Sequence, residues 1–138
     1  MLPEQLVRPV ECLSQSFYIS PHELSQRAAI HAFDGQAEME TVKAGYDLNR
    51  RELAAALPQF GFTRIAPVQG AFYMYAGIEE LASDSMAFVD DMLEQAGVAA
   101  TPGLDFDERR GHQFVRFSFA GTGDDIREAV DRLANWLK

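Results

Sequence analysis

The chain has 138 residues, 47% hydrophobic and 24% charged, which suits one domain with a buried core, or one domain plus a piece of another. Its net charge of −9 argues against nucleic-acid binding, because phosphate contacts need a basic surface. One cysteine excludes an internal disulfide framework, and the sequence shows neither a membrane-spanning run nor a secretory signal. These features predict a cytoplasmic protein without nucleic-acid or membrane partners.

The first part of the chain is predicted to be helical. Apolar residues at helical spacing predict helices over residues 1–16, 21–33 and 37–59. Pro9 is expected to kink or shorten the first helix. In "SPHE", Ser20 is the expected N-cap of the second helix, and Glu23 completes a capping box.

Strands and helices alternate in the rest of the chain. Runs of β-forming residues predict strands over residues 62–65, 70–77, 98–101 and 113–119. Helical periodicity returns over residues 85–96 and in a last amphipathic helix that ends near Leu137, with Thr122 or Asp124 as its cap. The expected fold class is α+β: a small antiparallel or mixed sheet covered by helices.

Few residues form a recognisable chemical motif. The three histidines, His22, His31 and His112, show no metal-ligand spacing, and the cysteine has no CxxC partner, so no metal site is expected. The "GTG" at residues 121–123 is better explained as a turn and helix start than as a phosphate loop.

Arg116 is the exception, because it stands among the strand-forming residues of "QFVRFSFA". An unpaired buried charge is too costly to keep, so the guanidinium must reach water or find an anion. It either extends to the sheet edge, pairs with a structural carboxylate, or binds the carboxylate of a substrate in a bidentate manner. The pattern alone does not separate these interpretations.

Five segments in order resemble the C-terminal part of a class I/II aminotransferase, a pyridoxal-phosphate enzyme of fold type I. They are "SQSFYISPHELSQRAA", "NRRELAAAL", "PVQGAFYMYAGI", "LEQAGVAATPGLDF" and "QFVRFSFAGTGDDIREAVDRL". The resemblance is to the aspartate-aminotransferase-like subgroup and covers nearly the whole chain. It implies that residues 1–35 end the large cofactor domain and that residues 36–138 form the small C-terminal domain.

The resemblance also assigns site residues. In the family, the arginine of the "R-x-S-F/Y-A" strand binds the substrate α-carboxylate, which implies this role for Arg116. The "P-x-G-A-F-Y" segment resembles a strand at the mouth of the active site, which implies that Phe72 faces the substrate. The resemblance further implies a homodimer, with pyridoxal 5'-phosphate bound in the intact enzyme.

The chain departs from the family pattern in its lysines. The chemistry needs a lysine that binds the cofactor aldehyde, and neither Lys43 nor Lys138 stands in the family's lysine motif. We therefore expect no covalently bound cofactor and no transamination by this chain alone. Three alternatives stay open: a stand-alone amino-acid-binding module, a self-associating α+β module, or a lyase or acyl-condensing enzyme on the same fold.

Overall fold

The computed structural model describes residues 2–138, and contacts within the chain define two compact units. The first unit extends to Glu40 and the second begins at Thr41. The predicted boundary between residues 1–35 and 36–138 concerns the domains of a longer enzyme, and it stays a prediction.

The first unit consists of short helices. They are α1 (Glu4–Phe17), α2 (Glu23–Ile30), the 3-10 turn η1 (Ala32–Gly35) and the beginning of α3 (Gln36–Ala56). Pro9 lies inside α1 without ending it. The predicted capping box at Ser20 is wrong, because the His22 ring caps α2 by accepting a hydrogen bond from the Leu24 backbone N–H. No described residue of this unit is buried.

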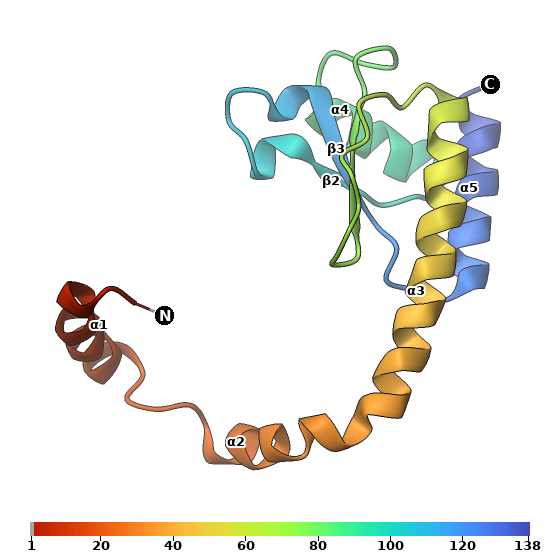
Figure 1. Ribbon diagram of the computed structural model, residues 1–138. Helices are drawn as coiled ribbons and strands as arrows, with labels where there is room; N and C mark the ends of the chain where they lie inside the picture. Colours follow the sequence, from red (N-terminus) through yellow and green to blue (C-terminus); the bar gives the residue numbers. More distant parts are fainter. Residues whose placement is uncertain (1) are drawn as a thin grey trace. The chain divides into compact units, whose positions relative to one another are not determined.

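The second unit contains the sheet. After the rest of α3 and the turn η2 (Leu57–Phe60) come β1 (Tyr73–Gly77), α4 (Ser85–Asp91), the π-helical turn η3 (Met92–Ala96), β2 (Thr101–Pro102), η4 (Gly103–Asp105), η5 (Gly111–Gln113), β3 (Phe114–Ser118) and α5 (Gly123–Trp136). The three strands pair antiparallel in the order β1-β3-β2 (Figure 1). This confirms the α+β class and shows that the sheet is antiparallel.

Three predicted strands differ from those observed. Of the strand predicted over residues 98–101 only Thr101 is in β2, and Pro102, expected to end it, pairs with Val115. Residues 62–65 make only one bridge, between Thr63 and Gly77, and Arg64 turns the chain with a φ of 46°. The strand predicted from residue 70 begins at Tyr73, because Ala71 adopts the left-handed region at φ 55°. Local β-propensity marked these segments, but strand pairing decided their length.

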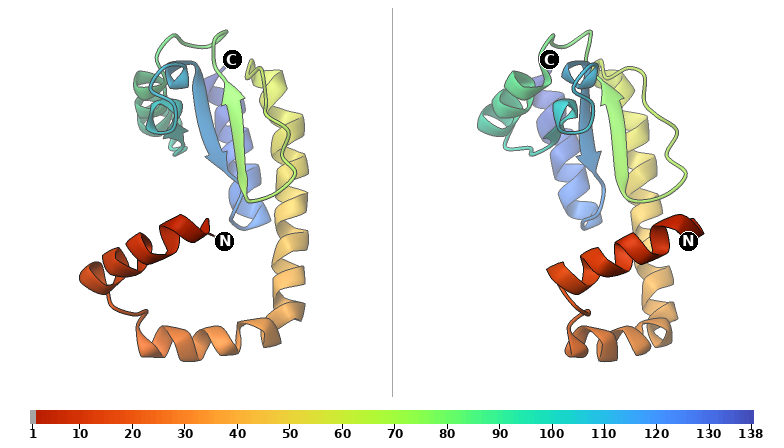
Figure 2. Two further views of the ribbon diagram at one scale, coloured as in Figure 1. Left: turned by 60° about the vertical axis from the view of Figure 1, so that its left-hand side comes forward. Right: turned by 90° about the vertical axis from the view of Figure 1, so that its left-hand side faces the viewer.

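The core lies against one face of the sheet. Met74 and Ala76 of β1 pair with Phe117 and Val115 of β3, and all four side chains are buried. Helices α3, α4 and α5 add Leu53, Phe88, Val89, Ile126 and Leu133 to the same hydrophobic cluster. The left view of Figure 2 shows α5 beside the second half of α3, and Arg127 lies 4.0 Å from the Glu52 carboxylate.

Two polar contacts fix the connection that follows β3. The buried Asn49 side chain of α3 donates to the carbonyls of Phe119 and Gly121, at 3.1 and 3.0 Å. Thr122 caps α5 in a capping box with Asp125, which confirms Thr122 as the cap. The end of β3 is therefore held by α3 on one side and by the start of α5 on the other.

Candidate functional site

Strand alternation places Arg116 on the face of the sheet opposite the core. Its neighbours Val115 and Phe117 are buried, whereas Arg116 is half-buried. Successive side chains of a strand point to opposite faces. In the central strand β3, Arg116 pairs with Tyr75 of β1 on one side and Thr101 of β2 on the other. The arginine that seemed out of place in an apolar strand therefore belongs to a separate, polar and aromatic face.

Aromatic rings surround the Arg116 guanidinium. Its Cζ lies 4.0 Å from the centre of the Tyr73 ring and 4.3 Å from the centre of the Phe106 ring. One terminal nitrogen, Nη2, donates to the Thr101 hydroxyl at 3.3 Å. The Nε atom is buried and has no hydrogen-bond partner. An unsatisfied buried donor is costly, so it commonly marks a functional position.

No carboxylate within residues 2–138 lies within 4.0 Å of the Arg116 guanidinium. Other arginines are paired: Arg50 with Asp47 at 2.7 Å, and Arg132 with Glu128 at 2.8 Å. The interpretation of Arg116 as a partner of a structural carboxylate is therefore wrong for the described chain. Its charge and most of its donors are left for water or for an anion from outside, so the other two interpretations stay open.

Phe72 lies next to this arrangement. Its ring centre is 4.3 Å from that of Tyr73 and 6.3 Å from that of Tyr46, and the side chain is 38% exposed. The Phe72 carbonyl accepts the backbone N–H of Phe119, which ties the start of β1 to the end of β3. Phe72 therefore joins Arg116 through the Tyr73 ring, and its role toward a substrate stays a prediction.

The loop of residues 103–111 brings Phe106 to the site. A Cβ atom on Gly103 or Gly111 would collide with the backbone of the other, so only glycine permits this close approach. Inside the loop, the Asp107 carboxylate accepts the backbone N–H groups of Arg109 and Arg110, at 2.9 and 3.1 Å. These hydrogen bonds, the one from Arg110 first, lower the pKa of Asp107.

Tyr75 lies beneath this loop. Its ring stacks on Phe114 with centres 4.8 Å apart, and a Cβ atom on Gly103 would approach its hydroxyl to 2.6 Å. Burial raises the pKa of the Tyr75 phenol, and the nearby Asp107 charge adds to that effect. The phenol therefore stays neutral beneath the loop at physiological pH.

Sequence reasoning predicted Arg116 and Phe72 as site residues but gave no role to Tyr73, Thr101 or Phe106. The strand pattern contained one usable signal: Tyr73 and Tyr75 share a face of their strand at a spacing of two residues. Thr101 and Phe106 required the strand register and the loop fold, and no local pattern indicates them.

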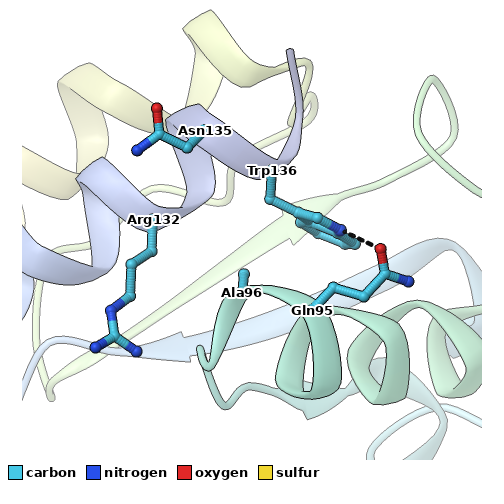
Figure 3. Close-up of a pocket in the computed structure, with 5 residues that line it drawn as sticks. All are labelled: Gln95, Ala96, Arg132, Asn135 and Trp136. Carbon is cyan, nitrogen blue, oxygen red and sulfur yellow. Dashed lines mark hydrogen bonds between the residues drawn. The ribbon is translucent and has the colours of Figure 1, made fainter.

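A second candidate is a pocket of about 430 Å³ between η3 and α5, lined by Gln95, Ala96, Arg132, Asn135 and Trp136 (Figure 3). The Trp136 indole donates to Gln95 at 3.1 Å, shown as a dashed line. Arg132 is already bound to Glu128 and donates to the Gly97 carbonyl at 3.4 Å. Because its main polar groups are satisfied internally, this pocket is a weaker candidate than the Arg116 site.

Residues 2–138 contain no group of three or more His, Cys, Asp or Glu side chains that could hold a metal ion. Nor does this part of the chain include a helix long and apolar enough to cross a membrane. Lys43 is exposed on α3 and Lys138 is exposed after α5, and neither belongs to the elements around Arg116.

The geometry leaves the Arg116 guanidinium without an ion-pair partner in residues 2–138, and comparisons with known proteins supply the family of the chain. Residues 3–133 match the family model of aminotransferase class I and II. The chain is 46% identical to the valine–pyruvate aminotransferase of Mycobacterium tuberculosis over 99% of its own length. It is 31% identical to an aspartate/prephenate aminotransferase of Thermus thermophilus over 98% of its length. The chain belongs to the class I and II aminotransferase family.

Solved structures agree with this assignment. An aminotransferase from Mycobacterium tuberculosis superimposes with a TM-score of 0.90 at 46% identity, over 99% of this chain and 36% of that one. The N-succinyldiaminopimelate aminotransferase of the same organism gives a TM-score of 0.81 at 28% identity. The chain spans about a third of the length of these relatives: 36% of the valine–pyruvate enzyme and 35% of the aspartate/prephenate enzyme.

Proposed function

We propose that this chain is the substrate-carboxylate-binding part of a pyridoxal-phosphate-dependent aminotransferase. The enzyme would transfer an amino group between an amino acid and a 2-oxo acid. The observation that carries the proposal is Arg116: a half-buried guanidinium between aromatic rings with no carboxylate of the described chain as its partner. A planar guanidinium presents paired N–H donors that match a carboxylate.

Amino acids and 2-oxo acids share the carboxylate that Arg116 would bind. Holding that group fixes the α-carbon and its substituents relative to the rest of the active site, which is an orientation effect. The charge-assisted hydrogen bonds are strengthened because the rings keep water from the guanidinium faces. Phe72, beside Tyr73, would line the approach to the site.

The residues of this chain do not fit the cofactor itself. Pyridoxal phosphate, when bound, supplies the electron sink of the reaction and needs a lysine for its attachment. Lys43 and Lys138 are both exposed and lie outside the elements around Arg116. We therefore place the cofactor lysine and the phosphate ligands in the remaining part of a longer enzyme, and we expect no transamination by these 138 residues alone.

The relatives favour amino transfer over the other chemistries of the fold. Those named above are all aminotransferases, which supports this reaction over β-elimination or acyl condensation. Their names differ in substrate, so we propose the class, an amino acid with a 2-oxo acid, and a homodimeric enzyme, without a particular donor.

Binding to Arg116 is the direct test. The ¹⁵N-labelled 138-residue chain is titrated with propionate, and with propylamine as a probe without a carboxylate, while the Arg116 Nε–H resonance is followed. We expect propionate alone to shift that resonance. Arg116→Lys has no Nε–H group, so its binding is followed through the backbone amides of Thr101 and Phe117, which should shift with propionate in the wild type. The substitution should abolish those shifts because it keeps the charge but loses the paired donors. Arg132→Gln, at the second pocket, is the matched control and should bind propionate like the wild type.

The same residue is then tested in the full-length enzyme that we propose contains this chain. Arg116→Ala should weaken transition-state binding of amino acids by about 2–5 kcal/mol, the scale for truncating one partner of a buried charge pair. A kcat/KM within about twofold of the wild type would contradict the assignment. A stand-alone amino-acid-binding module would also bind propionate in the titration, but it would have no transaminase activity for Arg116→Ala to lower.

A further inference from the structure

We propose that Tyr73 and Phe106 are positioning residues that hold the Arg116 guanidinium in the plane in which it receives a carboxylate. Together with Thr101 they form what we term the arginine clamp. The inference rests on the proposed function of Arg116 and adds the residues that determine its geometry. It concerns side chains of this chain only.

The two rings reach Arg116 from opposite neighbours of its strand. In the order β1-β3-β2, Tyr73 belongs to β1 and Phe106 follows β2, so β3 lies between their origins. Ring centres at 4.0 and 4.3 Å from Cζ are within the range of cation–π contact. A guanidinium is weakly hydrated and stacks readily on aromatic faces. The rings therefore replace water over the guanidinium and restrict its tilt.

Thr101 restricts the remaining rotation. It pairs directly with Arg116 in the β2–β3 register, and its hydroxyl accepts from Nη2 at 3.3 Å. The guanidinium has five N–H donors, and this hydrogen bond uses one of them. With two rings in contact with it and one donor anchored, Arg116 offers its remaining donors to an incoming carboxylate.

The position of Phe106 is fixed by its loop rather than by burial, because the side chain is 52% exposed. Its backbone N–H donates to the Gly103 carbonyl at 3.0 Å, and that of Gly111 donates to the Asp107 carbonyl at 2.7 Å. Gly103 and Gly111 touch backbone to backbone at the two ends of the loop. Because the loop holds the backbone of Phe106 in place, its ring keeps its position beside the Arg116 guanidinium although half of the side chain is exposed.

The test uses the full 138-residue chain with propionate as the probe. Phe106→Leu removes the ring but keeps an apolar side chain, and Phe106→Tyr keeps the ring. We expect Phe106→Leu to weaken propionate binding about threefold to tenfold, the effect of losing one partly desolvated cation–π contact. Phe106→Tyr should bind within about twofold of the wild type. Phe33→Leu, an exposed phenylalanine of the first unit, is the control.

A second readout separates positioning from general structural support. The heteronuclear NOE of the Arg116 Nε–H group should fall in Phe106→Leu and recover in Phe106→Tyr, while the backbone amides of Val115 and Phe117 stay unchanged. Tyr73→Leu should give the same pattern, and it provides an independent variant if Phe106→Leu does not fold.

The outcomes distinguish the two proposals. One outcome would overturn the arginine clamp and leave the proposed function standing. In it, Arg116→Lys loses propionate binding, while Phe106→Leu and Tyr73→Leu keep both propionate binding and the heteronuclear NOE of the Arg116 Nε–H group. Unchanged binding in Arg116→Lys would overturn the proposed function. Weaker binding with a more mobile Nε–H group in both leucine variants supports the clamp.

Discussion

The two units of this chain both contain helices, but they differ in what their side chains bury. In the first unit, apolar residues such as Leu13, Phe17 and Phe33 are exposed, and none of its described residues is buried. In the second unit, β1, β3 and the helices around them enclose a continuous core. The helices of the first unit bury no side chain of the described chain, whereas the second unit is stabilised by burial.

This difference explains why the candidate site around Arg116 lies in the second unit. Arg116, Tyr73, Thr101 and Phe106 come from three strands and a loop that pack on one core. A binding geometry needs side chains held by rigid elements, and only the second unit provides them. The uncovered apolar side chains of the first unit are typical of a surface that contacts other protein, which agrees with a chain that spans a third of its relatives.

The largest expected difference between the units is in the free energy of unfolding lost when one leucine is replaced by alanine. Leu133 of α5 is 1% exposed, and Leu13 of α1 is 56% exposed. Leu133→Ala should lower the free energy of unfolding by about 2–5 kcal/mol, because it removes buried contacts and leaves a cavity. Leu13→Ala, its matched control in a helix, should change it by about 0.5 kcal/mol or less. Urea denaturation measures both, and equal losses would refute the distinction between the units.

A smaller effect is expected from the polar contact that fixes the end of β3. Asn49→Asp keeps the shape of the side chain but replaces the N–H donor to the Phe119 and Gly121 carbonyls with an acceptor. The expected loss is about 1–3 kcal/mol, the cost of leaving buried polar groups without a partner. Asn135→Asp, on the exposed surface of α5, is the control in the same denaturation experiment and should be close to neutral. A neutral Asn49→Asp would show that the contact contributes nothing to the second unit.

The smallest effect concerns the loop that carries Phe106, and it depends on pH. The Arg110 and Arg109 backbone N–H groups favour the ionised Asp107 carboxylate and hold its pKa below the ordinary value of 3.8. The stabilisation is therefore complete above the unfolded-state pKa and is lost as the pH falls through the lowered folded-state pKa. The advantage in unfolding free energy over Asp107→Asn should shrink below about pH 4. A pH-independent difference between the two proteins would exclude this role for the carboxylate.

Local signals in the sequence were sufficient for several elements. The apolar periodicity of α5 was predicted and confirmed, and of the two predicted caps, Thr122 and Asp124, the structure confirms Thr122. Both features depend on residues within a few positions of each other. The capping box at Ser20 was wrong, since the neighbouring His22 satisfies the helix start instead. Residues 62–65 have strand-forming side chains, but only Thr63 finds a partner. A strand exists only where another strand pairs with it.

The sequence by itself showed that Arg116 is a charged residue in an apolar strand with no neighbouring partner to explain it. The family resemblance then suggested which role to propose for it. Only the tertiary structure decided what surrounds it. Tyr73, Thr101 and Phe106 are distant from Arg116 along the chain, and they meet it through strand register and a loop closed by two glycines. Helix periodicity and caps are encoded by neighbours in sequence, whereas the environment of a strand side chain depends on which strands pair and in which register.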